Sequence, residues 1–172
     1  MQGTAKKRDQ FKDTDEPKKF SIMWILLILA AAAIGAWFAW NRPVASHAAV
    51  TPDSDGVIRF AVDDFADGKA HYFSFKDGGS EVRFFLVRST DGVIRAALDS
   101  CDVCYREQRG YRQEGDDMVC NNCNQHFRTD LVNVVKGGCN PVPLERQQVG
   151  NQILVRAADL ANGFGYFALA VR

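Results

Sequence analysis

The 172-residue chain has no excess of charge of either sign, because 21 lysines and arginines balance 21 aspartates and glutamates. It also lacks a stripe of basic residues interleaved with aromatics, an internal repeat and a low-complexity tract. A protein that binds nucleic acid through its phosphates needs clustered positive charge. The sequence therefore predicts no nucleic-acid partner, and its length allows one membrane tether plus one modest domain.

The motif for covalent haem attachment is also missing. That attachment needs a histidine directly after a Cys-x-x-Cys pair. The chain has two such pairs, but Tyr105 follows Cys101/Cys104 and Asn124 follows Cys120/Cys123. The sequence thus argues against haem at these cysteines.

The spacing of these four cysteines indicates a metal site. Two residues within each pair let one short turn aim both sulfurs at a common point, and two such turns together form a tetrahedral four-thiolate site. Between the pairs, Glu114-Gly115-Asp116-Asp117 is a turn sequence that predicts a hairpin folding the second pair back onto the first. Spacing alone leaves a structural zinc site, rubredoxin-type iron, an iron–sulfur cluster, and disulfides or a reactive dithiol as open interpretations.

A fifth cysteine and a nearby histidine are secondary candidates for metal ligands. Cys139 lies in Gly137-Gly138-Cys139-Asn140-Pro141, where the glycines permit unusual backbone angles and the proline stops any regular element. An odd cysteine in an oxidising compartment is reactive, paired between chains, or a ligand. His126 follows Cys123 by three residues, although a lone histidine beside Phe127 is more often a surface or core residue.

Four stretches around the cysteines resemble the FtrD-like family of bacterial membrane proteins. They are residues 97–105 (ALDSCDVCY), 110–116 (GYRQEGD), 118–123 (MVCNNC) and 137–141 (GGCNP). The likeness extends over roughly residues 56 to 170 and is more specific than a bare Cys-x-x-Cys pair. The family is described as iron–sulfur-containing and is associated with ferrous iron uptake, so the resemblance implies iron or an iron–sulfur centre in preference to zinc. Carried over to this chain, the implied ligands are Cys101, Cys104, Cys120 and Cys123, with less support for Cys139.

The N-terminal part of the sequence predicts a membrane anchor. Residues 1–19 are polar and predict a disordered cytoplasmic tail. Residues 20–40 contain no charged side chain and would extend about 30 Å as a helix, which matches the hydrocarbon core of a bilayer. Trp24, Trp37 and Trp40 suit the two membrane interfaces. We therefore expect a transmembrane helix over 20–40.

Charge on either side of this helix predicts its orientation. Six lysines and arginines precede it, whereas only Arg42 follows closely. The positive-inside rule then places the N-terminus in the cytoplasm and the domain in the periplasm, anchored in the bacterial inner membrane. Cleavage near Ser46-His47-Ala48 is the alternative, but the apolar run exceeds that of a usual signal peptide. Residues 41–55 are interpreted as a linker, in which we expect His47 to be solvated.

Residues 56–172 predict a small, mainly β (α+β) extracytoplasmic domain that carries the four-cysteine metal hairpin. Short apolar runs predict four successive strands, at 57–62, 70–75, 81–88 and 93–98. Turns at Asp77-Gly78-Gly79 and Asp91-Gly92 would join them into a meander whose last strand leads into Cys101. His71 is interpreted as a partly buried residue with a satisfied side chain.

The segment after the cysteine pairs is less regular. Residues 127–135 fit either a short helix or a strand. Residues 152–155 predict a strand, 157–160 one helical turn, and 166–171 a final piece of the sheet.

These features together predict a membrane-anchored electron-transfer or iron-handling accessory of an iron-uptake system. The expected partners are the membrane and either an iron permease or a redox protein. Tyr105, Tyr111 and Phe127 would shield the centre from water, and backbone amides would hydrogen-bond its sulfurs. Two alternatives stay open: a structural zinc ribbon that contacts a permease, and a thiol–disulfide oxidoreductase, which Asp102 inside the first pair disfavours.

Overall fold

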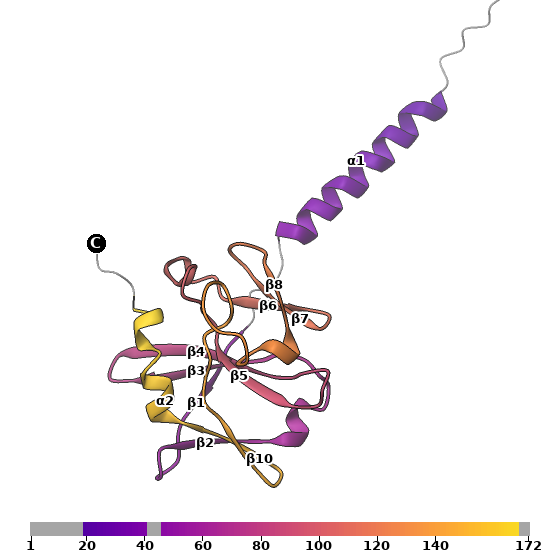
Figure 1. Cartoon of the computed structure of the whole chain (residues 1–172). Coiled ribbons are helices and arrows are strands. Elements are labelled where there is room, and N and C mark those ends of the chain that lie inside the picture. The colour runs from indigo at the N-terminus through magenta and orange to yellow at the C-terminus, as the bar shows by residue number, and fades with distance from the viewer. Residues whose placement is uncertain (1–18, 41–45, 169–172) are drawn as a thin grey trace, which may run out of the picture. The chain divides into compact units, whose positions relative to one another are not determined.

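The computed structural model describes residues 19–40 and 46–168 (Figure 1). The chain divides into two compact units, Met1–Val44 and Ala45–Arg172, and each is described by itself. Most of the predicted cytoplasmic tail and the first part of the predicted linker lie outside the described residues.

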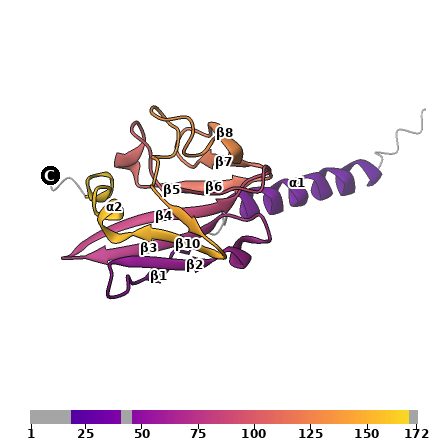
Figure 2. The same ribbon diagram turned by 60° about the horizontal axis from the view of Figure 1, so that its bottom comes forward.

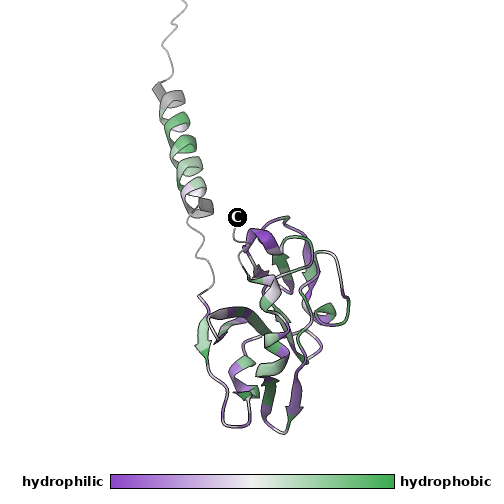
Figure 3. Cartoon of the chain, turned by 90° about the vertical axis from the view of Figure 1, so that its left-hand side faces the viewer, coloured by the Kyte–Doolittle hydropathy of each residue, from purple (hydrophilic) through white to green (hydrophobic). Residues whose placement is uncertain are grey.

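The first unit contains helix α1, which runs from Lys19 to Trp40. The side chains of residues 23–37 are all exposed, and hydrophobic residues dominate this part of the helix in Figure 3. Of the helices in the described residues, none is long and apolar enough to cross a membrane. The prediction of a transmembrane helix over 20–40 is therefore not confirmed.

The second unit is built around a four-stranded sheet with the strand order β1-β3-β4-β5 (Figures 1 and 2). Its strands are β1 (Ala48–Val50), β3 (His71–Asp77), β4 (Ser80–Arg88) and β5 (Ile94–Leu98). The last three form the predicted antiparallel meander, and Gly92 in the β4–β5 turn has the positive φ of 81° that such a turn needs. β1 pairs in parallel with β3, so the sheet begins inside the segment interpreted as a linker.

Strand β4 is buried on both faces of this sheet. Phe84 and Leu86 belong to one apolar cluster, and the alternate residues Phe85 and Val87 belong to another. Successive strand residues point to opposite faces, so an uninterrupted apolar run fits a strand covered on both sides. The sheet therefore separates two cores.

The first core lies between the central sheet and a second, three-stranded sheet. That sheet has the order β2-β10-β9, with β2 at Val57–Ala61, β10 at Gln152–Arg156 and β9 at Gln147–Val149. β2 and β10 confirm two predicted strands. Their inward residues Ile58, Phe60, Ile153 and Val155 pack with Phe84 and other buried residues of the central sheet.

The second core lies between the opposite face and a third sheet with the order β6-β7-β8. Its strands are β6 (Tyr111–Glu114), β7 (Asp117–Cys120) and β8 (His126–Arg128). Figures 1 and 2 both show the central sheet lying between the other two. Three cysteines are buried in this core beside Tyr111 and Met118.

The remaining elements are short helices. The α-helix α2 covers Ala157–Ala161, as predicted, and single 3-10 turns occupy Val62–Phe65, Tyr105–Glu107, Thr129–Leu131 and Phe164–Tyr166. The ambiguous segment 127–135 thus contains the end of β8 followed by a 3-10 turn. The prediction that the sheet resumes at residue 166 is wrong over the described residues 166–168, because Tyr166 lies in a 3-10 turn and no strand follows it there. The domain is mainly β, as expected.

Candidate metal centre

The five cysteines come from three loops at one end of the second core. β5 ends at Leu98, and the chain turns through Cys101 and Cys104 before the 3-10 turn Tyr105–Glu107. Cys120 is the last residue of β7, and Cys123 lies in the turn that leads to β8. The predicted hairpin between the pairs is confirmed, because β6 and β7 pair through a turn in which Gly115 has a φ of 59°.

The sulfurs converge as two overlapping groups of three. The sulfurs of Cys101, Cys104 and Cys120 lie within 4.8 Å of one another, and we call them the inner triad. The sulfurs of Cys104, Cys123 and Cys139 meet the same limit and form the outer triad. Cys104 belongs to both, and its sulfur is 3.9 Å from that of Cys139. The structure thus brings both Cys-x-x-Cys pairs together and adds Cys139 to them, all five as free thiols.

The two triads differ in solvent exposure. Cys101 and Cys120 are each 2% exposed and Cys104 is 9% exposed, whereas Cys123 is exposed and Cys139 is half-buried. One side of the cluster is therefore sealed by the core, and the other opens to solvent.

Backbone amides donate hydrogen bonds to the sulfurs, as the sequence predicted. The amide of Cys104 lies 3.1 Å from the sulfur of Cys101. The amides of Asn122 and Cys123 donate to the sulfur of Cys120, and the amide of Gln125 donates to that of Cys123. Hydrogen bonds to a thiolate favour its charged form and tune a metal bound to it. Both Cys-x-x-Cys turns therefore already have the donors that thiolate ligands need.

The thiols differ in their affinity for protons. Burial raises the pKa of Cys120 to about 12, although the amides of Cys123 and Asn122 oppose this effect. Burial also raises the pKa of Cys139, and its hydrogen bond to Cys123 adds to the shift. At Cys123, burial is outweighed by hydrogen bonds from the Gln125 amide and from neighbouring thiols, so its pKa is lowered. Of these three thiols, the exposed Cys123 is thus the one whose pKa the surroundings lower.

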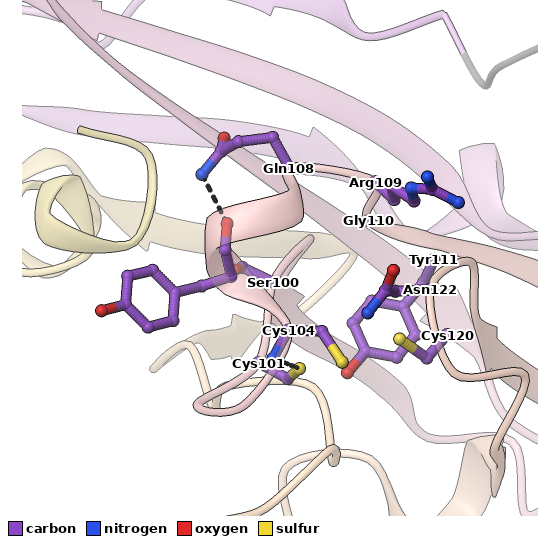
Figure 4. A pocket seen from close by; sticks show the side chains of 10 residues that line it. Ser100, Cys101, Cys104, Gln108, Arg109, Gly110, Tyr111, Cys120 and Asn122 are labelled. Atoms are coloured by element: carbon purple, nitrogen blue, oxygen red, sulfur yellow. Dashed lines mark hydrogen bonds between the residues drawn. The ribbon is translucent and has the colours of Figure 1, made fainter. Parts of the chain in front are cut away.

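A small cavity adjoins the inner triad (Figure 4). It has a volume of about 10 Å³, and its lining includes Cys101, Cys104, Cys120, Tyr105 and Tyr111. A cavity needs roughly 10–15 Å³ by this measure to hold one water molecule. Figure 4 shows these three sulfurs near one another beside the Tyr111 ring.

Tyr111 closes the buried side of the cluster. Its side chain is 2% exposed, and its hydroxyl donates a 2.6 Å hydrogen bond to the carbonyl of Cys139. Burial, followed by the nearby Cys101, raises the pKa of Tyr111, so its hydroxyl stays protonated. Phe127 packs edge-on against the Tyr111 ring at 6.2 Å, and Tyr105 also lines the cavity. Tyr111 and Phe127 thus pack in the same cluster as the buried cysteines, and Tyr105 lies beside them in the cavity lining.

A buried carboxylate that sequence reasoning missed holds the hairpin against the central sheet. Asp99 is 3% exposed, and its Oδ1 accepts a 2.6 Å hydrogen bond from the amide of Tyr111. Gly110 must be glycine here: its φ is 62°, and a Cβ would lie 2.3 Å from Asp99 Oδ2. The available signal was an acidic residue directly after a predicted strand and two residues before Cys101.

His47 lies on the other side of this carboxylate. Its Nε2 is 2.9 Å from Asp99 Oδ2, and its side chain is only 13% exposed. Its ring packs edge-on against Tyr72 at 5.6 Å. The expectation that His47 is a solvated linker residue is therefore wrong, because β1 draws this segment into the sheet. No local pattern around His47 indicates a partner 52 positions away.

The other two histidines lie outside both triads. His126 is exposed, and its Nδ1 is 3.2 Å from Asp117 Oδ2. His71 is half-buried, with its Nε2 3.1 Å from Asp67 Oδ1, which confirms the interpretation of a satisfied residue. The candidate ligand His126 is thus paired with a carboxylate, while Cys139 is the residue that joins the four paired cysteines.

Thiolate sulfurs are the protein ligands of iron–sulfur clusters and also bind zinc or mononuclear iron. The donor set therefore fits an iron–sulfur or iron centre, since five sulfurs converge and backbone amides already point at several of them. Residues 65–167 match the family described as "Membrane iron-sulfur containing protein FtrD-like". The chain belongs to this family. Its membership was inferred from the cysteine stretches and is confirmed.

Comparison with curated proteins gave no match. Among solved structures, the chain is similar to the quaternary ammonium Rieske monooxygenase CntA bound to the inhibitor MMV12, with 17% identity, a TM-score of 0.37, and coverage of 60% of this chain and 32% of that one. The same enzyme with gamma-butyrobetaine gives 17% identity, a TM-score of 0.36, and coverage of 59% and 32%. The chain thus spans about a third of the length of those proteins.

Proposed function

We propose that this protein is a membrane-anchored iron or iron–sulfur protein that passes electrons or iron between the components of an iron-uptake system. The observation that carries the proposal is the convergence of five thiols, three of them buried and two on the solvent side. Membership of a family described as membrane iron–sulfur proteins supports the same function.

The arrangement of the cluster suits transfer better than catalysis on a small substrate. Iron held by thiolates supplies one-electron chemistry, with a potential that depends on hydrogen bonds to sulfur and on exposure. Cys101 and Cys120 would bind on the side that excludes water, and Cys123 on the side that a partner can approach. The cavity beside the inner triad, at about 10 Å³, leaves no room for an organic substrate.

The anchor in this proposal is the apolar segment 20–40, with the N-terminus in the cytoplasm and the domain in the periplasm. Its support is the absence of charge in this segment and the excess of lysine and arginine before it. An iron permease or a membrane redox protein would then lie within reach of the exposed sulfurs.

The test is a metal and sulfide analysis of the full-length protein, purified without oxygen in detergent, together with its absorption spectrum. Visible bands that bleach on reduction, with iron present, would support the proposal. One equivalent of zinc and no colour would identify a structural zinc ribbon. A metal-free protein that cycles between dithiol and disulfide would identify a thiol–disulfide oxidoreductase, and both of these results would refute the proposal.

A further inference from the structure

The outer triad offers a metal ion a site of its own beside the inner triad. The sulfurs of Cys104 and Cys139 lie 3.9 Å apart, and all three outer sulfurs lie within 4.8 Å of one another. Two thiolates bound to the same tetrahedral ion, with metal–sulfur bonds of about 2.3 Å, lie about 3.8 Å apart. The outer sulfurs therefore need little movement to share one ion.

The outer triad has one side open to solvent. Cys123 is exposed, and so are its neighbours Asn122 and Asn124. Metal sites that exchange a ligand keep three protein ligands and one open position, whereas structural sites are closed by four protein ligands. Three sulfurs with an exposed side thus suit an ion that arrives from, or leaves to, a ligand on another molecule.

The inner triad is suited to retaining an ion. Cys101 and Cys120 are buried, and backbone amides donate hydrogen bonds to both sulfurs. The adjoining cavity, at about 10 Å³, is at the lower limit for a single water molecule. A competing ligand therefore has little access to this side of the cluster, and the exposed side, where Cys123 lies, is the side on which an ion can leave.

Cys139 is held beside Cys104 by the fold itself. Its carbonyl accepts the 2.6 Å hydrogen bond from the hydroxyl of Tyr111, which belongs to the buried core. Gly137 and Gly138 have positive φ angles of 85° and 63°, which let the chain turn just before Cys139. The backbone of Cys139 is thus attached to the core, and its sulfur is positioned for the outer triad without belonging to the inner one.

We propose that the outer triad is the site at which a ferrous ion enters and leaves, and that Cys104 passes the ion between the outer and inner triads. This inference rests on the iron-handling form of the proposed function. In the inward step the bonds from the ion to Cys123 and Cys139 break, bonds to Cys101 and Cys120 form, and the bond to Cys104 persists. Two protons move from the inner thiols to the outer thiolates, so the ion keeps three sulfur ligands and its oxidation state does not change.

The test is the release of iron from the metal-loaded, full-length protein in neutral detergent to an excess of the ferrous chelator ferrozine, without oxygen. We expect the release rate of wild type to level off as the chelator concentration rises, because movement of the ion from the inner to the outer triad becomes rate-limiting. Cys139→Ser should retain its iron but release it about tenfold more slowly, because a ligand of the exit site is missing. A cysteine that only binds the ion would have the opposite effect, since its loss weakens binding and speeds release.

Two further variants complete the test. Cys101→Ser weakens the inner triad, so it should hold less iron and release it faster than wild type. His126→Gln is the matched control and should release iron at the wild-type rate, because this exposed side chain pairs with Asp117 and lies outside both triads. Release from Cys139→Ser at the wild-type rate or faster, slower release from Cys101→Ser, or an equal slowing in His126→Gln would overturn the transfer role and leave the proposed function standing. A purified protein without iron would refute the proposed function and this inference together.

Discussion

The two faces of the central sheet support cores of different kinds. On the face of Phe84 and Leu86, the buried cluster consists of apolar residues from three sheet strands, from β2 and β10, and from flanking segments. On the face of Phe85 and Val87, the cluster is smaller and includes Cys101, Cys104 and Cys120. Strands β3, β4 and β5 thus contribute residues both to a conventional apolar core and to the core that contains the thiol cluster.

The apolar core contributes mainly to stability, whereas the core with the cysteines also carries the proposed function. Burial of apolar area stabilises the first core without any ligand. The second core places thiols and the Asp99 carboxylate among its apolar residues, so part of its stability depends on what those groups bind. We therefore expect metal-site changes to loosen one face of the sheet and to leave the other intact.

The largest effect should come from Cys104, whose sulfur belongs to both triads. Cys104→Ser removes a ligand from each group, so we expect metal content below about a tenth of wild type. Cys139→Ser is the control, since Cys139 belongs to the outer triad alone. It should retain the inner triad and most of the metal, with an altered spectrum. The measurement is the metal content of both purified variants. Full metal retention by Cys104→Ser would show that the shared sulfur is not a ligand.

The second largest effect should come from two adjacent residues of β4 that point to opposite faces of the central sheet. Phe84 and Phe85 are both fully buried but belong to different cores. Phe84→Ala and Phe85→Ala should each lower the free energy of unfolding by about 3–5 kcal/mol, measured in urea at low temperature. Only Phe85→Ala should change the visible spectrum or speed the loss of metal to a chelator. Equal spectral changes in both variants would mean that the two cores are not independent.

A smaller effect is expected at the glycine that precedes the hairpin. Gly110→Ala introduces a Cβ at a φ of 62° and against the Asp99 carboxylate, so we expect a loss of about 2 kcal/mol and a disturbed metal spectrum. Gly115→Ala is the matched control: its φ is 59°, but a Cβ there meets nothing within 4 Å. It should cost about 1 kcal/mol and leave the spectrum unchanged. If both variants lost the same stability and kept the same metal spectrum, the contact between Gly110 and Asp99 would not affect the metal site.

The sequence predicted the parts of this fold that local chemistry determines. The strand at residues 81–88, the Asp91-Gly92 turn and the hairpin between the cysteine pairs depend on alternation and turn residues, which act over a few positions. The proximity of the two cysteine pairs likewise follows from spacing, and the structure distributes the four cysteines over two triads that share Cys104.

The missed features depend on contacts between distant positions. β1 adds in parallel to β3 through three residues that carry no strand signal of their own. The pairing of His47 with Asp99 depends on that strand, and Cys139 reaches the cluster because Pro143 and Leu144 bind β5. No periodicity in these segments encodes such partners, so the His47–Asp99 pair needed the structure, which also placed the secondary candidate Cys139 beside Cys104 and Cys123.

The smallest effect concerns Asp67, a surface carboxylate in a turn that Gln113 of β6 joins to the third sheet through hydrogen bonds with Gly68 and Ala70. Hydrogen bonds from the Lys69 amide and then from His71 lower the pKa of Asp67. A carboxylate whose pKa is lowered in the folded state stabilises the fold above its unfolded value of about 3.9, and this contribution disappears as the pH falls through the lower folded value. Asp67→Asn should therefore be slightly less stable than wild type at pH 6, and the difference should shrink as the pH falls through the lowered folded pKa of Asp67. Urea midpoints of both proteins across this range, with and without metal, provide the measurement. The expected difference is the same with and without metal, and a difference that depends on metal would show that the metal centre affects this turn through Gln113.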